Sequence, residues 1–349
     1  MRALSRRDLF GLAAGASPLA RMLAQPAIAP YPGRSIVSLV AGEDRRKNAY
    51  NALVAIDDQI RPALKRKKRV LIKPNCVAVK FQLGSTHADA LRGILDYLAP
   101  RFRGPVVIAE SSRDDTSEAY ENFQYNRVVS EYRSQKVSLV DLNEEERYQV
   151  LELVDPNLHL TQVRLAGRLF DPEAFLIGSA MLKSHDTVVA TLSVKNMALG
   201  APVHSPRKAA APWHDKRKYH AGYRQTHFNI LLTARKLRPF WGATVIDGFE
   251  GMEGNGPMNG TPVASRLAIA STDLVAADRV GVEVIGVNPL WVGYLNYCCQ
   301  AGLGQYDLSK IDIRGIKPAT VVRKYQLHTD IERQLQWMGP MTELPPKLG

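Results

Sequence analysis

Short apolar runs alternate with amphipathic stretches along the first third of this chain. The runs at residues 35–40, 70–73 and 105–109 are rich in β-branched side chains, which favour buried strands. Between them, residues 47–64 and 86–98 repeat apolar side chains at helical spacing, and Thr86 is a suitable helix cap. This alternation predicts an α/β fold, with a mostly parallel sheet and helices on both faces.

Polar residues follow the apolar runs in five places. They are Lys73 with Asn75, Glu110, Lys183 with His185, Lys195 with Asn196, and Asp247. Open α/β sheets bind ligands beyond the carboxyl ends of their strands. We therefore expect the strand tips to converge on one cleft.

A glycine-rich stretch spans residues 242–260 (GATVIDGFEGMEGNGPMNG). A short strand is predicted up to Asp247, and the glycines that follow allow positive φ angles and close approach of a ligand to the backbone. This predicts a shaped ligand-binding loop that includes Gly254, Asn255 and Gly256. The alternative is a long hairpin or surface loop with solvated acids. The stretch matches neither GxGxxG nor GK[ST], so it does not predict nucleotide binding.

Three acids in this stretch offer oxygen ligands for a hard divalent cation, namely Asp247, Glu250 and Glu253. Their spacing does not fit an EF-hand loop, and no HExxH zinc motif occurs in the chain. The alternative is that Glu250 or Glu253 orients a lysine across the site.

Lysines and histidines are the candidates for chemistry. Desolvation beside buried runs would lower the pKa of Lys73, Lys183 or Lys195 and allow base or Schiff-base roles, with simple anion binding as the favoured alternative. His185 and His227 are candidates for proton transfer. Further polar side chains at predicted strand ends and helix starts would contact the ligand: Asn75, His87, Glu110, Asn196 and Asn229.

Residues 201–224 are basic, contain three prolines and include His204, His214 and His220. This composition is typical of a mobile loop, and we expect it to close over the cleft as a lid. In such a basic loop, His214 and His220 are most simply solvated.

The chain is basic, with a formal charge of +12, which favours anionic partners. The run KRKKR at residues 65–69 precedes an apolar strand and no RNA-binding pattern accompanies it, so a small anionic molecule is expected rather than nucleic acid. The three cysteines are Cys76, Cys298 and Cys299. They form no CxxCxxC run, so no ferredoxin-type iron–sulfur site is predicted.

The N-terminus resembles a twin-arginine export signal. Residues 5–10 read SRRDLF, residues 9–20 form a weakly apolar stretch of twelve residues, and Ala27-Ile28-Ala29 is a small-residue cleavage pattern. The alternative is an amphipathic N-terminal helix. No stretch is apolar enough to span a membrane. We predict a signal peptide over 1–29, transport by the twin-arginine machinery, a periplasmic location, and one large domain over 30–349 or two lobes at about 34–180 and 181–320.

The longer motifs resemble a family known as domain of unknown function 362. They include VLIKPN at residues 70–75, LSVKNMALG at 192–200, VIDGFEGMEGNGP at 245–257 and ASTDLVAAD at 270–278. Some relatives add an iron–sulfur module, and this chain lacks the cysteines for it, so electron transfer through a cluster is not implied. The resemblance implies that this chain has the same site as members of that family, but it does not imply which reaction takes place there.

These features lead to one hypothesis and one alternative. The hypothesis is an exported enzyme acting on an anionic small molecule, in which Lys73, Lys183 and Lys195 neutralise its charge and His185 or His227 transfers a proton. The loop from Asp247 would position the ligand or a divalent ion. The alternative is a non-catalytic periplasmic protein that binds a ligand or cofactor.

Overall fold

The computed structural model describes residues 31–220 and 222–339. The predicted export signal at residues 1–29 lies outside this range. Among the described residues, no helix has both the length and the apolar character that a bilayer crossing requires.

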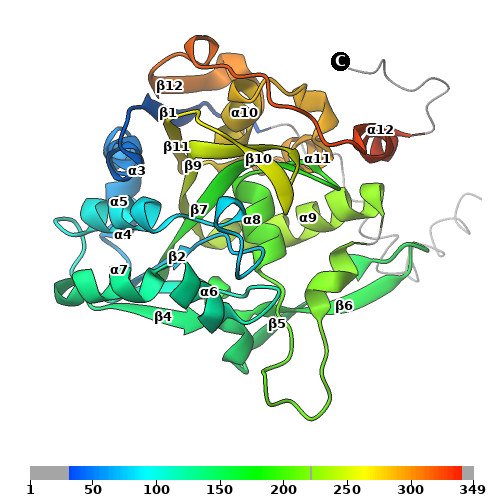
Figure 1. Cartoon of the computed structure of the whole chain (residues 1–349), viewed down its shortest axis with the longest axis horizontal. Helices are drawn as coiled ribbons and strands as arrows, with labels where there is room; N and C mark the ends of the chain where they lie inside the picture. Colours follow the sequence, from blue (N-terminus) through cyan, green and yellow to red (C-terminus); the bar gives the residue numbers. More distant parts are fainter. Residues whose placement is uncertain (1–30, 221, 340–349) are drawn as a thin grey trace, which may run out of the picture.

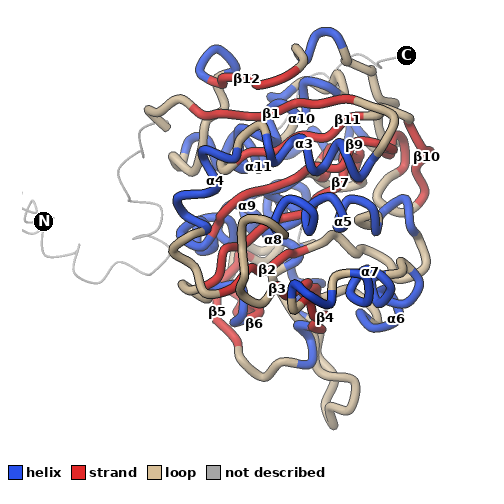
Figure 2. Tube along the Cα trace, turned by 90° about the vertical axis from the view of Figure 1, so that its left-hand side faces the viewer, coloured by secondary structure: helices blue, strands red, loops and turns tan. Residues whose placement is uncertain are grey.

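A large mixed sheet forms the centre of the protein. Its strand order is β12-β1-β11-β9-β7-β2-β3-β4, with β8 paired to β7 and β10 paired to β9. Figure 2 shows these strands stacked one beside the next. The bounds are β1 Ser35–Ala41, β2 Arg69–Lys73, β3 Val106–Glu110, β4 Val137–Asp141, β7 Ala174–His185, β8 Val189–Thr191, β9 Trp241–Asn255, β10 Asn259–Val263, β11 Leu267–Ser271 and β12 Ile311–Gly315.

Most of the sheet is parallel. Strands β9, β7, β2, β3 and β4 run in one direction. Strand β11 is antiparallel to both β9 and β1, and β12 pairs parallel to β1. The predicted α/β fold with a mostly parallel sheet is therefore confirmed.

Helices cover both faces of the sheet (Figure 1). On one face lie α3 Arg45–Val54, α4 Asp57–Leu64, α5 Ala88–Leu98, α6 Thr116–Asn122 and α7 Tyr125–Glu131. On the other lie α8 Ser193–Gly200, α9 Tyr223–Leu237, α10 Leu274–Val284, α11 Gly293–Gln300 and α12 Ile331–Leu335. Successive β2 side chains enter opposite cores, Val70 and Ile72 on one face and Leu71 on the other. This explains why the strands read as continuous apolar runs.

A separate two-stranded sheet is formed by β5 (Tyr148–Val154) and β6 (Leu160–Ala166). Asn229 of α9 fixes β5, because its side-chain amide donates to the Val154 carbonyl and its oxygen accepts from the Val154 amide, both at 2.9 Å. Asn229 therefore joins helix α9 to the two-stranded sheet.

Two helices differ from the sequence-based expectation. The helix predicted over residues 47–64 is two helices, α3 and α4, separated at Ile56, whose ψ of 21° lies outside the helical range. Helix α5 begins at Ala88, with His87 as its cap, because His87 Nδ1 accepts a hydrogen bond from the Asp89 amide. The expected cap, Thr86, instead bonds to Asn75 N and to the Ser179 carbonyl.

The glycine-rich stretch is a hairpin. Strand β9 continues through Asp247 as far as Asn255, and β10 pairs with it from Gly251 onward. The predicted strand end at Asp247 is therefore wrong, and the hairpin alternative is the one observed. Glycines fit this pairing because a Cβ at Gly256 would clash with the Ser184 carbonyl, and Gly254 adopts φ +71°.

The apolar run that precedes Lys195, residues 188–194, is a strand only in part. Strand β8 ends at Thr191, and α8 begins at Ser193. The buried Asp278 carboxylate accepts hydrogen bonds from the Ser193 and Val194 amides at 2.7 and 2.9 Å. It satisfies amides that a helix start leaves without partners. Lys195 therefore lies on the first turn of a helix and not at a strand tip.

Candidate functional site

A pocket of about 200 Å³ lies beyond the carboxyl ends of β2, β3 and β7. Helix α8 and the segment 201–220 complete its wall. Its polar and charged lining residues are Lys73, Asn75, Glu110, Ser111, Arg113, His185, Asp186, Thr191, Lys195, Asn196, Lys216 and His220. Six of the predicted site residues meet here: Lys73, Asn75, Glu110, His185, Lys195 and Asn196.

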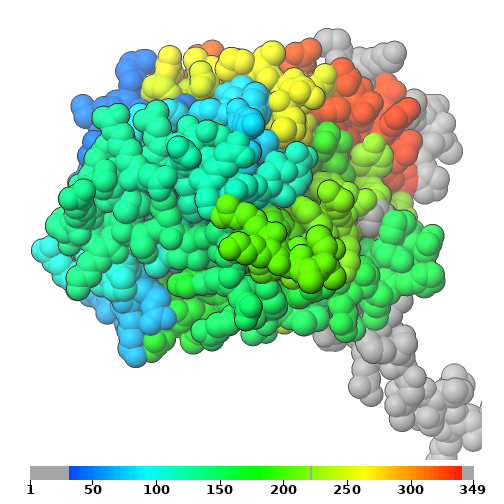
Figure 3. Space-filling view, turned by 60° about the horizontal axis from the view of Figure 1, so that its bottom comes forward, coloured from blue at the N-terminus to red at the C-terminus, as the bar shows by residue number. Residues whose placement is uncertain are grey.

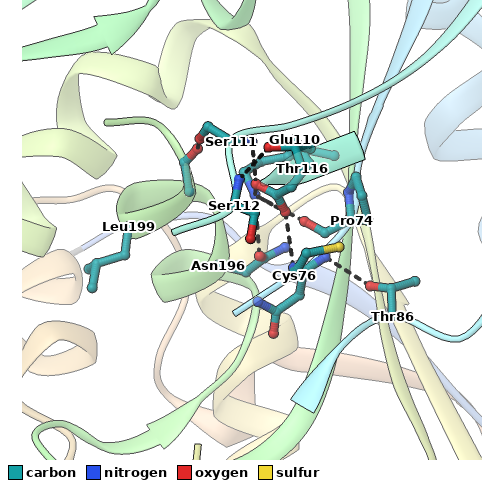
Figure 4. Close-up of polar contacts among 12 residues, drawn as sticks. Pro74, Cys76, Thr86, Glu110, Ser111, Ser112, Thr116, Asn196 and Leu199 are labelled. Atoms are coloured by element: carbon teal, nitrogen blue, oxygen red, sulfur yellow. Dashed lines mark hydrogen bonds and ion pairs between the residues drawn. The ribbon is translucent and has the colours of Figure 1, made fainter. Parts of the chain in front are cut away.

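An ion pair forms the floor of the pocket. Lys73 Nζ donates to both carboxylate oxygens of Glu110, at 2.9 and 3.0 Å, and to the Pro74 carbonyl at 2.9 Å. Glu110 also accepts from the amides of Cys76 and Ser111, at 3.1 and 2.8 Å (Figure 4). Because both charges are so fully bonded, this pair shapes the pocket and has little capacity left for a ligand.

Gly200 at the end of α8 allows Lys73 to reach Glu110. A Cβ at this position would overlap Cε and Nζ of Lys73. The LSVKNMALG motif therefore ends in glycine because the Lys73 side chain occupies the space that a larger residue would need.

Lys195 presents an ammonium group that has no hydrogen-bonding partner in the described part of the chain. The residue is 6% exposed, and among the described residues its Nζ makes no hydrogen bond or ion pair. Burial and the charge of Lys73 lower its pKa to about 8, against the opposing charge of Asp186. A lysine in this state can hold an anion or exchange a proton near neutral pH.

His185 lines the same pocket as a neutral ring. Burial and the charge of Lys195 lower its pKa to about 3. Its Nδ1 accepts from the Thr187 amide at 3.0 Å and also lies 2.9 Å from the Asp186 carboxylate. The first contact needs a lone pair on Nδ1 and the second needs a proton. Burial favours the neutral ring, in which Nδ1 can satisfy only one of these two contacts.

Three basic residues at the pocket were not among the predicted site residues. Lys216 Nζ donates to Ser111 Oγ at 2.9 Å and to the Leu199 carbonyl at 3.2 Å, and burial lowers its pKa to about 7. Arg113 and His220 also line the wall. Composition identified the segment 201–224 as basic, but sequence spacing gave no means of telling which side chain turns inward.

The charge balance of the pocket is positive. Four cationic side chains, Lys73, Lys195, Lys216 and Arg113, face two carboxylates, Glu110 and Asp186. Because Lys73 and Glu110 neutralise each other, the excess positive charge lies on Lys195, Lys216 and Arg113, with Asp186 opposing it. Low-dielectric walls strengthen their attraction for an anion.

Lys183 is buried beneath the site and does not line it. Its Nζ donates to the Gly84 carbonyl at 2.6 Å. Burial, together with the charge of Lys195, holds the pKa of Lys183 well below its usual range. Because this amine is neutral and enclosed, it cannot neutralise a ligand in the pocket.

Asp247 and the other two acids lie elsewhere and do not form a ligand cluster. Asp247 is buried 3.4 Å from Arg45 Nε, and Arg45 also reaches Glu250 at 3.8 Å. Glu253 instead accepts from the Gln326 amide. Over the described part of the chain, no group of three or more histidine, cysteine, aspartate or glutamate side chains is arranged to hold a metal ion.

The remaining predicted residues serve the fold. His227 is buried among Tyr294 and Trp337 rings, and its Nδ1 accepts from the Tyr294 amide. His87 caps α5. Asn255 accepts from Thr329, and Gly254 of β9 pairs with Gly260 of β10. Gly256 lies in the turn between these strands, and the next residue, Pro257, does line the pocket.

Comparison with known proteins assigns a family. The family model described as "Domain of unknown function (DUF362)" matches residues 70–283, more than half of the chain. A thylakoid-associated protein of Synechocystis sp. is 33% identical over 129 residues, and this match spans 36% of the present chain and 37% of the relative. A crystal structure of a Thermotoga maritima protein aligns over 80% of this chain and 62% of its own, with a TM-score of 0.40 and 10% identity. On the strength of the family match, the chain belongs to the DUF362 family.

Proposed function

We propose that this protein is an enzyme that binds a small anionic molecule in the pocket and moves a proton on it through Lys195. The observation that carries the proposal is the Lys195 ammonium, which is nearly buried in a cationic pocket and, among the described residues, makes no hydrogen bond or ion pair, with only the more distant Asp186 carboxylate opposing its charge. A charge in that position is costly unless it gains a counter-ion, and a bound anion would supply one.

Each pocket residue has a distinct role in this proposal. Arg113 and Lys216 hold the anionic group of the ligand, while Lys73 and Glu110 keep the floor rigid. Lys195, with a pKa of about 8, exchanges a proton with the ligand because its protonated and neutral forms are both populated near neutral pH. His185 offers a polar, uncharged ring to the ligand and stays neutral throughout.

Ligand binding is tested first. Thermal unfolding of the full chain at pH 7 is measured with inorganic phosphate, acetate, malate and citrate in turn. We expect at least one of these anions to raise the Tm of the wild type and to have a much smaller effect on Lys195→Met. Lys65→Met is the matched control, because Lys65 is an exposed lysine outside the pocket. Equal shifts in all three proteins would contradict the proposal.

Catalysis is tested separately. Each stabilising carboxylate is incubated with the protein in D₂O, and loss of carbon-bound protons is followed by ¹H NMR. If the protein is an enzyme of this kind, we expect carbon-bound protons to exchange with deuterium in the wild type and not in Lys195→Met. Binding without exchange would instead favour the non-catalytic ligand-binding protein.

Export by the twin-arginine pathway is also proposed, from the SRRDLF sequence and the Ala27-Ile28-Ala29 pattern. The relative in Synechocystis is named as thylakoid-associated, and the periplasmic location proposed here for this chain rests on its own N-terminus. Replacing Arg6 and Arg7 with lysine should leave the full-length precursor in the cytoplasm, as judged by fractionation and N-terminal sequencing. A precursor that is cleaved and exported as before would contradict it.

A further inference from the structure

A second, larger pocket of about 530 Å³ adjoins the proposed site and shares Arg113 with it. The loop between His204 and His214 forms part of its wall and projects from the body of the protein (Figure 1). In Figure 3 this light-green segment lies at the surface beside the teal segment that follows β3. An ion pair between Arg207 and Asp115 joins the two segments.

The two histidines are held opposite each other. Their backbones form an isolated antiparallel bridge, and the Ser205 amide donates to the Trp213 carbonyl at 2.9 Å. The ring centres are 5.2 Å apart, with 38° between the ring planes. The pair is therefore a fixed feature of a short hairpin and not a chance meeting of two mobile side chains.

Hydrogen bonds to carbonyl oxygens set the tautomer of each ring. His204 Nδ1 lies 2.8 Å from the Ser205 carbonyl, and His214 Nε2 lies 3.3 Å from the Arg113 carbonyl. A carbonyl can only accept, so both of these nitrogens carry the proton. The opposite nitrogens, His204 Nε2 and His214 Nδ1, are buried and find no hydrogen-bond partner within residues 31–220 and 222–339.

Two imidazole rings with centres at this separation, each with an unpartnered nitrogen, suit a metal ion. A metal-ligating histidine characteristically donates its other N–H to a carbonyl or carboxylate, as both of these rings do. With bonds of about 2.0–2.1 Å and tetrahedral geometry, two ligating rings would have centres about 5 Å apart, close to the spacing found here. Burial and nearby positive charge lower the pKa of His214, which keeps its lone pair available.

The charged groups around the pair are largely balanced. Asp114, Asp115 and Asp141 line the same pocket as Arg113, Arg207 and Arg217. Arg113 pairs with Asp114, and Arg207 pairs with Asp115 and Glu144. Asp141 interacts electrostatically with His204. The positive charge that still acts on His214 comes from Arg217 and Lys216.

We propose that His204 Nε2 and His214 Nδ1 bind a divalent transition-metal ion such as Zn²⁺, with water completing the coordination. Neutral imidazoles select ions of this class over Mg²⁺ or Ca²⁺. Two protein ligands and an open pocket predict an exchangeable ion rather than a structural one. The two proposed ligands lie outside the anion pocket, although the two pockets share Arg113, and Lys195 takes no part in this site.

Isothermal titration of the metal-free full chain with Zn²⁺ tests the proposal. We expect one site in the wild type, with affinity at least tenfold weaker in His204→Ala and in His214→Ala. His159→Ala is the matched control, because that side chain is 77% exposed and lies outside both pockets. Unchanged affinity in the two pocket variants, or an equal loss in the control, would overturn the proposal.

A second measurement separates loss of a ligand from loss of folding. Circular dichroism melts check each variant, and His214→Gln keeps a side chain of similar reach. Cu²⁺ bound to the wild type should show an electron paramagnetic resonance spectrum with coupling to two imidazole nitrogens, reduced to one in either single variant. A two-nitrogen signal that persists in His204→Ala, or that disappears in His185→Ala, would place the ion elsewhere.

Discussion

Lys73 Nζ lies 2.9 Å from Glu110 Oε1, and the two side chains are only 1% and 3% exposed. The lysine ends β2 and the glutamate ends β3, so the pair connects two neighbouring parallel strands where they reach the pocket. An ion pair this deeply buried is stable only when both partners are present and otherwise hydrogen-bonded.

Removing one partner of this pair should be strongly destabilising. Lys73→Met leaves the Glu110 carboxylate buried without its counter-ion, and we expect a loss of about 3–5 kcal/mol in the free energy of unfolding. Urea denaturation at pH 7 measures it.

The double variant Lys73→Met/Glu110→Gln is the control for that experiment. It removes both charges, so it should recover part of the stability lost in Lys73→Met. A double variant as unstable as the sum of the two single variants would show that the residues act independently, contrary to the geometry.

Gly200→Ala should also disturb the Lys73–Glu110 ion pair. The added methyl group would occupy the position of the Lys73 amine, so the lysine must withdraw from Glu110. We expect a loss of unfolding free energy comparable to that of Lys73→Met. In a Lys73→Ala background, where nothing occupies that space, the same change should cost much less. Equal costs in both backgrounds, measured by urea denaturation, would refute the explanation for this glycine.

The sequence was sufficient to predict the sheet, because apolar runs and helical spacing are local properties. It was also sufficient to predict that Lys73, Glu110 and His185 lie at the same edge of the sheet, because the carboxyl ends of neighbouring parallel strands meet there. It could not locate Asp247, whose strand continues past it in a hairpin, and the many glycines there suggested a loop. Nor could it reveal Lys216 or the His204–His214 pair, because their positions depend on how the basic segment folds back on the protein.

Acid should destabilise the protein through its buried neutral histidines. Burial lowers the pKa of His227 and of His185 to about 3, whereas an unfolded histidine titrates near 6.5. The stability they contribute is fully present above pH 6.5 and is lost as the pH falls toward 3, by about 1.4 kcal/mol per pH unit for each ring.

The variant His227→Asn tests this pH dependence. Asparagine can still accept from the Tyr294 amide but does not titrate, so the loss of unfolding free energy between pH 6.5 and 4 should be shallower than in the wild type. Urea denaturation across this range measures it. His159→Asn, at an exposed position, should keep the wild-type slope, and a wild-type slope in His227→Asn would contradict the assignment.

Anion binding should weaken as the pH rises. The pKa of Lys216 is lowered to about 7 and that of Lys195 to about 8, so both lose their charge across the range from pH 6.5 to 9. The Kd for the stabilising anion, measured by isothermal titration at constant ionic strength, should therefore increase several-fold over this range. In Lys195→Met/Lys216→Met the pH dependence should largely disappear. A Kd that is constant up to pH 9 in the wild type would mean that neither lysine titrates as described.

The most direct test of the account is the reactivity of the Lys195 amine. Acetylation of the folded protein by acetic anhydride is quantified by mass spectrometry between pH 6.5 and 10, with and without the anion that raises the Tm. We predict that Lys195 reacts with a midpoint near pH 8 and is protected by the anion, whereas exposed Lys65 shows neither property. A Lys195 that titrates like Lys65, or that the anion does not protect, would contradict the claim that a free, easily deprotonated amine faces a ligand in this pocket.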